Sequence, residues 1–250
     1  ADIFLEGDAV ATLKSLVAVI REKGVDAAVV ASRFRKWSAA HDNLVAGKKS
    51  LEHASLAKNT ITPVGLCAML GNILPDDSVY IDETITHRPI IVRHLAFQGP
   101  QSFFSVPSGG LGQGLGLALG TKLAMRDRLV VSVIGDGSFM YNPVVQSLAL
   151  SKHRDLPVLI VIFNNGGYSA MRKEHHTYYP DGVAAEHNTS VGHTITDLDY
   201  SELGSPFGFY GCRVDKLSDL PAALKKARQE VEGGTTAILN VILDDAAGSN

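Results

Sequence analysis

Cysteine is scarce in this chain: only Cys67 and Cys212 occur, far apart and outside any CxxC or Cys/His pattern. The sequence therefore indicates neither a disulfide framework nor a zinc site, and we expect two buried thiols in a reducing compartment, the cytoplasm. No apolar run approaches the roughly 20 residues of a membrane span. Because the start, ADIFLEGDAV, also lacks the basic and apolar regions of a signal peptide, we expect no membrane association.

An excess of positive charge is also missing. With 23 Lys and Arg against 26 Asp and Glu, the net charge of −3 gives no electrostatic reason to expect nucleic acid. The hydrophobic share of 45% and charged share of 20% are typical of a globular protein, and 250 residues suffice for one generous domain, or for one domain plus part of a second. A small-molecule or protein partner is therefore expected.

Three catalytic or nucleotide-binding patterns are absent. No GxSxG surrounds Ser138, so a hydrolase nucleophile is not indicated, and no HExxH occurs among the histidines. Leu117 stands where Gly112 and Gly114 would require a third glycine for the GxGxxG pattern. A Rossmann-type nucleotide-binding enzyme is therefore disfavoured, although a preference for NAD would revive that alternative.

What is present is a regular alternation of helical and strand patterns from residue 60 onward. The predicted strands are SVYIDE, LVVSVI, LPVLIVIF, CRV and AILNVIL, and helical patterns cover 63–74, the GGLGQGLGLALGTKLAM segment, 142–153 and 218–232. Strands that are apolar throughout and alternate with helices predict a doubly wound, mostly parallel α/β sheet with helices on both faces. Ligands of such a sheet bind at the carboxyl ends of its strands.

The first 59 residues read differently. A short strand and an amphipathic helix are predicted at the start, with Leu13, Leu16, Val17 and Ile20 at helical spacing, followed by a polar, helical linker. We therefore divide the chain into 1–45, continued by the linker to about residue 59, and a domain at 60–250.

Glycines recur four apart at Gly112, Gly116 and Gly120 in a predicted helix. Each glycine in a helix interior costs about 1 kcal/mol relative to alanine, so we expect this helix backbone to approach a neighbour closely.

Two motifs follow adjacent apolar runs. GDGS ends LVVSVI, NNGG ends LPVLIVIF, and an intervening helix would place both at the same end of the sheet. Asp136 and Asn165 can then converge. Carboxylate and amide oxygens suit Mg²⁺, and the backbone N–H groups of Gly137 and Ser138 suit phosphate, so the pair predicts a magnesium-diphosphate site.

At this point the chain resembles a known family. GDGSFMYNPVVQSLALSKHRDLPVLIVIFNN is similar to the thiamine diphosphate signature of pyruvate decarboxylase, acetolactate synthase and benzoylformate decarboxylase. The resemblance covers roughly 60–243 and is closest to the benzoylformate decarboxylase branch in IDETITHRP, SFFSVPSGGLGQGLGLALGTKLA and NNGGYSAMR. It implies the diphosphate-binding domain of a thiamine diphosphate-dependent 2-oxo acid decarboxylase or carboligase. Acetolactate synthase-like carboligation is an alternative, although QHQ-type segments are absent.

The resemblance also implies roles for individual residues. Mg²⁺ would be held by Asp136, the Asn165 side chain and the Gly167 carbonyl. Leu111 would be the apolar wedge that bends the cofactor, and the Gly109 carbonyl would accept a hydrogen bond from its aminopyrimidine. The diphosphate would contact Gly137, Ser138, Tyr168, Thr84 and Thr86.

One part of the family pattern is missing. The glutamate that activates the cofactor belongs to a pyrimidine-binding domain of a partner subunit, and nothing here has the length or pattern of that domain, so no catalytic residue is expected in this chain. Residues 1–45 resemble the end of the family's middle domain. We expect part of a longer enzyme that forms a homodimer or homotetramer; a natural half-subunit and a catalytically silent module that binds a nucleotide or a partner protein are the alternatives.

Four further positions stay open. Glu83 either tunes the site or is an ordinary acid at a strand end, and His87 either lines the substrate pocket or is an exposed loop residue. Met171 is a pocket residue or a core methionine. The histidine-containing segment 172–200 is expected to be a solvated loop, with a lid over the site as the alternative.

Overall fold

The computed structural model describes residues 3–106, 110–189, 192–195 and 197–244 and divides the chain into two compact units, 1–49 and 50–250. The first unit contains α1 (Ala9–Lys23) and most of α2 (Ala27–Leu56). Asp8 caps α1 by accepting the N–H of Ala11 at 2.8 Å, and Gly24, at φ +73°, ends it. The predicted short strand is wrong: residues 3–6 form none, because a strand needs a neighbour to pair with and both described elements of this unit are helices.

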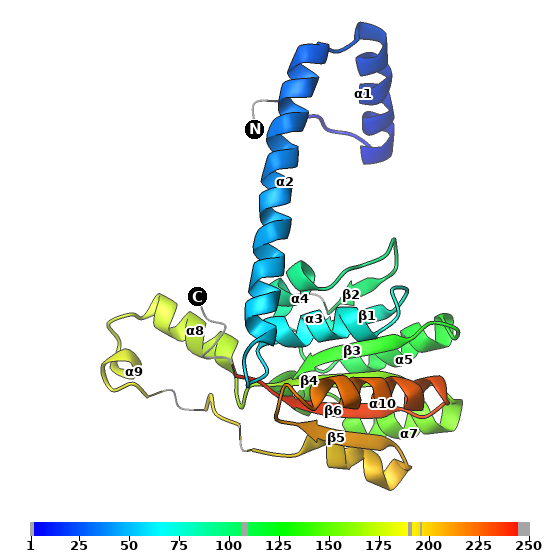
Figure 1. Ribbon diagram of the computed structural model, residues 1–250, viewed down its shortest axis with the longest axis vertical. Coiled ribbons are helices and arrows are strands. Elements are labelled where there is room, and N and C mark those ends of the chain that lie inside the picture. The colour runs from blue at the N-terminus through cyan, green and yellow to red at the C-terminus, as the bar shows by residue number, and fades with distance from the viewer. Residues whose placement is uncertain (1–2, 107–109, 190–191, 196, 245–250) are drawn as a thin grey trace. The chain divides into compact units, whose positions relative to one another are not determined.

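A six-stranded parallel sheet forms the centre of the second unit (Figure 1). Its strands run in the order β2-β1-β3-β4-β6-β5, and the predicted doubly wound α/β class is confirmed. The strands are β1 (Val79–Glu83), β2 (Phe103–Ser105), β3 (Val130–Gly135), β4 (Leu159–Asn164), β5 (Tyr210–Val214) and β6 (Ala237–Ile242).

Helices cover both faces of this sheet and bury its strands. One apolar cluster packs α3 (Pro63–Ile73), α4 (Arg88–His94) and α10 (Leu220–Glu232) on one face; the other packs α5 (Gly114–Ala124), α7 (Val144–Arg154) and η1 (Tyr200–Phe207) on the opposite face (Figure 1). Every residue of β3 and β4 is buried, which explains why both strands read as continuous apolar runs. Of the two cysteines, Cys67 is buried and Cys212 only half-buried, and neither forms a disulfide.

The strand order places a switch point between β1 and β3. From β1 the chain proceeds to β2 on one side, and the later strands β3 and β4 lie on the other. A crevice opens at such a point, beyond the carboxyl ends of the strands. The segments that leave these ends are 84–87 after β1, α6 (Asp136–Tyr141) after β3, and 165–168 followed by α8 (Ser169–Tyr178) after β4.

The expectation for the three glycines is wrong in two of its positions. Gly116 and Gly120 are exposed, and a Cβ added at either would meet nothing within 4 Å. Gly112 precedes α5 at φ +96°, a conformation that glycine adopts without strain. Close approaches lie at Gly112, where a Cβ would come within 2.6 Å of the Tyr141 carbonyl oxygen, and at Gly114, where it would come within 2.6 Å of the Glu83 carboxylate.

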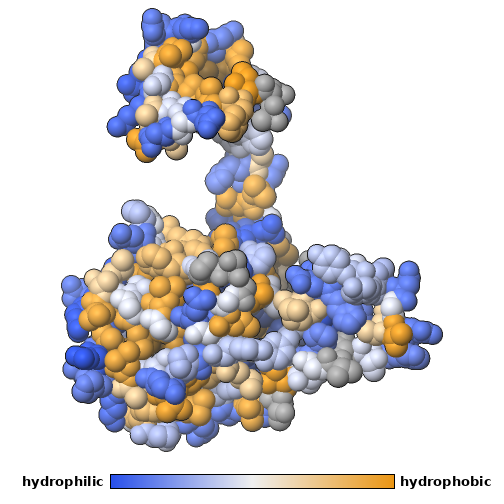
Figure 2. Space-filling view, turned by 180° about the vertical axis from the view of Figure 1, so that it is seen from behind, coloured by the Kyte–Doolittle hydropathy of each residue, from blue (hydrophilic) through white to orange (hydrophobic). Residues whose placement is uncertain are grey.

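Figure 2 shows one face of the molecule coloured by hydropathy, with apolar surface on the two N-terminal helices. In α1 no residue is buried, and the side chains of Val10, Leu13, Val17 and Ile20 are all exposed. Among the residues that the structure describes, no helix combines the length and apolar character that crossing a membrane requires.

Candidate functional site

A cleft of about 280 Å³ opens at the switch point of the sheet. Four chain segments line it: the loop after β1, residue 111, the start of α6, and the end of β4 with the start of α8. Of the twelve residues predicted for the site, eleven line this cleft, and Gly109 lies outside the described residues. The lining residues are Thr84, Ile85, Thr86, His87, Leu111, Gly135, Asp136, Gly137, Ser138, Phe163, Asn165, Gly167, Tyr168, Ala170, Met171 and Glu174.

Asp136 is the buried acid of the cleft. It begins α6 directly after β3 and is 2% exposed. Its Oδ1 accepts the N–H of Gly137 at 2.9 Å, whereas the buried Oδ2 has no hydrogen-bond partner among the described residues. Burial raises the pKa of this carboxyl to about 6, against the opposing effect of the nearby backbone N–H groups and of His87. A buried carboxylate oxygen without a partner fits a cation ligand.

Asn165 and Gly167 reach the same cleft from the end of β4. The Asn165 amide nitrogen donates to Ser169 Oγ at 2.9 Å, so its amide oxygen is the atom with which it would coordinate a cation. Gly167 forms an isolated antiparallel bridge with Thr194, and the adjacent Tyr168 N–H donates to the His193 carbonyl at 2.8 Å. A Cβ at Gly167 would collide with that carbonyl, so the position requires glycine. An acid, an amide and a backbone carbonyl form a hard oxygen set that fits Mg²⁺.

Gly137, Ser138 and Tyr168 also line the cleft. A Cβ at Gly137 would come within 2.8 Å of Cδ1 of Tyr168, so the absence of a side chain lets the ring lie against the α6 backbone. Burial raises the pKa of the Tyr168 hydroxyl, which keeps it a neutral donor. The hydroxyls of Ser138 and Tyr168 are neutral donors, which suits a diphosphate, whereas the Gly137 N–H already donates to Asp136 Oδ1.

The two threonines after β1, Thr84 and Thr86, differ in burial and in whether the hydroxyl can bind an anion. Thr84 is buried, and its hydroxyl donates to Asp82 Oδ1 at 2.7 Å, while Arg88 Nε pairs with Asp82 Oδ2 at 2.6 Å. The hydroxyl proton of Thr84 is therefore already used in a hydrogen bond, and the side chain offers an anion no donor in this arrangement. Thr86 is half-buried and lines the cleft.

Leu111, His87 and Met171 are the remaining predicted residues. Leu111 lies half-buried in the wall of the cleft. The exposed-loop alternative for His87 is wrong, because His87 is 3% exposed and its ring lies 5.7 Å from that of Phe163. Met171, on α8, is 56% exposed, so it is not a core methionine.

Sequence reasoning missed Ile85 and Glu174. Ile85 lies between the two threonines with φ +41°, a strained conformation for a β-branched residue that no sequence signal reveals. Glu174 lines the cleft one helical turn beyond Ala170 and Met171 on α8. The i, i+3 and i+4 spacing from these residues was the available signal, had a helix been predicted there.

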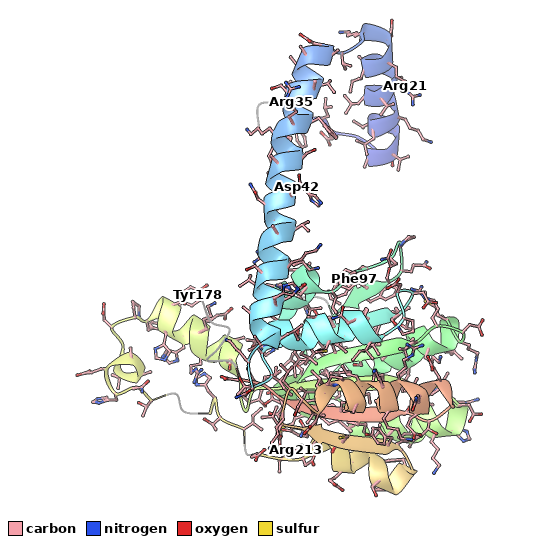
Figure 3. All side chains as sticks on the ribbon, in the orientation of Figure 1. Arg21, Arg35, Asp42, Phe97, Tyr178 and Arg213 are labelled. Carbon is pink, nitrogen blue, oxygen red and sulfur yellow. The ribbon has the colours of Figure 1, made fainter. Side chains whose placement is uncertain are left out.

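The segment expected as a solvated loop includes two helices, α8 and α9 (Val183–Glu186), so that expectation is wrong in part. Within α8 no residue is buried, and Tyr178 lies on it away from the packed sheet, 76% exposed (Figure 3). The end of the segment is bound to the rest of the second unit: the Ile195 N–H donates to the Gly166 carbonyl at 2.9 Å, and Asp197 forms an ion pair with Arg213 at 2.8 Å. Among the described residues, no three His, Cys, Asp or Glu side chains gather as a metal site.

Fold and cleft together define a doubly wound α/β domain whose acid-and-amide cleft lies at the switch point of a parallel sheet. The family described as "Thiamine pyrophosphate enzyme, C-terminal TPP binding domain" matches residues 86–241, and the chain belongs to that family. The resemblance drawn from the sequence is thereby confirmed.

Individual relatives cover most of this chain. The acetolactate synthase large subunit of Buchnera aphidicola subsp. Schizaphis graminum is 28% identical over 98% of the chain and 41% of its own length. Benzoylformate decarboxylase of Pseudomonas aeruginosa is 27% identical over 67% of the chain and 30% of its own length. The structure of the Rhodococcus jostii RHA1 thiamine diphosphate-dependent 4-hydroxybenzoylformate decarboxylase matches with a TM-score of 0.65 at 26% identity, over 76% of this chain and 33% of that chain. The chain thus spans well under half the length of each of these relatives.

Proposed function

We propose that this chain holds the Mg²⁺ and diphosphate end of thiamine diphosphate in an enzyme that decarboxylates a 2-oxo acid or transfers the resulting fragment to an acceptor. One observation carries the proposal: the buried Oδ2 of Asp136, without a hydrogen-bond partner among the described residues, faces a cleft shared with Asn165 and Gly167. A cation there would be coordinated by Asp136, the Asn165 side chain and the Gly167 carbonyl.

The residues of the chain bind and orient in this proposal. When bound, the cofactor supplies the electron sink that cleavage of a 2-oxo acid requires. Thr86, Gly137, Ser138 and Tyr168 hold the diphosphate, and Leu111 supports the bend of the cofactor from the cleft wall.

Substrate recognition falls to the remaining cleft residues. His87 and Met171 line the same cleft and would contact the substrate beside the cofactor. Glu174, on the same helix as Met171, adds a carboxylate.

The chain is proposed to work as part of a larger assembly. The activating glutamate would come from a pyrimidine-binding domain of the same or another subunit, in a homodimer or homotetramer. Residues 1–45 would belong to a preceding middle domain, with the linker reaching about residue 59 and the cofactor domain at 60–250. The two free cysteines favour a cytoplasmic location.

Titration calorimetry tests the binding proposal directly. The chain should bind thiamine diphosphate only when Mg²⁺ is present, and Asp136→Ala should abolish that binding while the exposed Asp181→Ala leaves it unchanged. Cofactor binding that is independent of Mg²⁺, or unaffected by Asp136→Ala, would refute the proposed site. No binding even with a pyrimidine-binding domain supplied would favour the catalytically silent module.

A second experiment decides the reaction, with a pyrimidine-binding domain supplied to this chain. Release of CO₂ from an aromatic 2-oxo acid, with the aldehyde as product, is the expected outcome, and it agrees with the names of the relatives in two comparisons. A carboligase is the second candidate, favoured by the matches to acetolactate synthases, and would instead convert pyruvate to acetolactate.

A further inference from the structure

Glu83, the last residue of β1, has a buried carboxylate that lies beside the cleft without lining it. The residue is 1% exposed. Its Oε1 accepts the backbone N–H groups of Gly112 at 2.8 Å and Gln113 at 3.0 Å, and its Oε2 accepts that of Gly114 at 3.0 Å. Three successive backbone donors from one loop thus converge on a single side chain.

Asn142 extends this arrangement to the helix that carries Asp136. Its amide nitrogen donates to Glu83 Oε2 at 2.7 Å and to the Ser138 carbonyl at 2.8 Å, and its amide oxygen accepts the N–H of Leu115 at 3.0 Å. The pair therefore joins the end of β1, the start of α5 and the end of α6 through direct hydrogen bonds.

The surrounding sequence is built to admit the carboxylate. A side chain at Gly114 would place a Cβ 2.6 Å from Glu83 Oε2, and Gly112 has the positive φ that turns its N–H toward Oε1. Within the part of the chain that the structure describes, no lysine or arginine bonds to Glu83, so oriented N–H donors at the start of α5 balance its charge. A fully hydrogen-bonded carboxylate of this kind fixes its donors in place, whereas an ordinary strand-end acid would face solvent.

We propose that Glu83 is a positioning residue that holds the loop carrying Leu111 at a fixed distance from the cation and diphosphate side of the cleft. The inference rests on the proposed function, because Leu111 adjoins Gly112 and lines the part of the cleft assigned to the body of the cofactor. Thr84 is held independently by Asp82. Asn142, which bonds the Ser138 carbonyl, loses only one of its three hydrogen bonds when Glu83 is changed and keeps those to Ser138 and Leu115, so the diphosphate side depends on Glu83 much less than residues 112–114 do. Loss of Glu83 should therefore loosen one wall of the cleft selectively.

Glu83→Gln is the test, since it keeps the size and replaces one acceptor oxygen with a donor that must face N–H groups. Hydrogen exchange at amides 112–114 should become at least tenfold faster in this variant. Its affinity for thiamine diphosphate with Mg²⁺ should fall about tenfold to a hundredfold, the effect of losing hydrogen bonds to a charged group. Its affinity for inorganic pyrophosphate with Mg²⁺ should stay within about twofold of the parent chain. Glu202→Gln, at an exposed glutamate of η1, is the matched control and should change none of the three.

Each alternative outcome is decisive. Unchanged exchange at 112–114, or an equal loss of pyrophosphate and thiamine diphosphate affinity, would overturn the positioning role. If Glu83→Gln fails to fold, Glu83→Asp keeps the charge but shortens the reach, and it should give the same selective pattern. Failure of the parent chain to bind thiamine diphosphate would count against the proposed function, while the exchange measurement would still decide whether Glu83 holds the loop.

Discussion

Burial makes the carboxylate form of Asp136 costly for the folded chain. Its pKa is about 6 in the folded state against 3.8 for an ordinary aspartate, so between pH 4 and pH 6 the folded state retains a proton that the unfolded state has lost. Stability therefore decreases as pH rises through this window and levels off above pH 6. A shift of this size corresponds to about 3 kcal/mol.

Asp136→Asn should remove this dependence, because the amide does not titrate. Relative to the variant, the parent chain should lose about 3 kcal/mol of unfolding free energy between pH 4 and pH 7, measured by urea denaturation without metal. The comparison uses the slopes of unfolding free energy against pH, because burying the amide side chain of the variant shifts its stability equally at every pH. Parallel stability profiles would show that Asp136 is not buried as the structure has it.

The two threonines after β1 provide a second residue-scale prediction. Thr84→Ala removes a hydrogen bond to the buried Asp82 and should lower the unfolding free energy by about 1–3 kcal/mol, with little change in the affinity for Mg²⁺-pyrophosphate. Thr86→Ala should do the reverse, leaving stability nearly unchanged and weakening the affinity about tenfold. Denaturation and calorimetry on both variants separate the roles, and a larger affinity loss for Thr84→Ala would contradict the assignment.

At the scale of elements, replacing the glycines of α5 by alanine should have opposite effects on stability, depending on the position. Gly114→Ala should destabilise the domain by more than 1 kcal/mol, because the new Cβ meets the Glu83 carboxylate at 2.6 Å. Gly116→Ala and Gly120→Ala should each stabilise it by about 0.5–1 kcal/mol, since both positions are exposed in a helix interior with open space around them. Chemical denaturation of the three variants tests this, and a destabilised Gly116→Ala would show a close approach that the structure lacks.

The two central strands, β3 and β4, were predicted from the sequence, and both are buried on both faces. Apart from Ser132 and Asn164, both strands carry apolar residues or glycine, because α5 and α7 cover one face and α3 and α10 the other. β2 escaped prediction because it has three residues between glycine- and proline-containing stretches. α8 escaped because it buries no residue, so no apolar periodicity marks it.

Some residues of the candidate site could be predicted from the sequence and others could not. Asp136 and Asn165 were predictable, because each follows an apolar strand and parallel neighbours end at one edge of the sheet. The function of Glu83 was not, because its partners lie at positions 112–114 and 142, and nothing local marks a strand-end acid that caps a distant helix. The hydrogen bond from the Thr84 hydroxyl to Asp82 could not be predicted either, because it depends on the orientation of the Asp82 side chain.

At the scale of the whole molecule, the two units differ in how much they bury. Residues 3–49 include no buried side chain, whereas both apolar clusters belong to residues 61–243. The last turns of α2 belong to the second unit, where Glu52 Oε1 accepts a hydrogen bond from Nδ1 of the buried His94 ring at 2.8 Å. Stability should therefore reside in the second unit, and the exposed apolar side chains of α1 should promote self-association.

A chain starting at Ser50 tests this division. It keeps the Glu52–His94 contact and should unfold with a free energy within about 0.5 kcal/mol of the longer chain. It should also sediment as a smaller species at concentrations where the longer chain associates through α1. Adding Glu52→Ala to the shortened chain should then lower its stability by about 1–3 kcal/mol, because the buried His94 loses its partner. If the shortened chain were instead markedly less stable while Glu52→Ala had no effect, residues 1–49 would contribute contacts to the second unit that burial in the structure does not reveal.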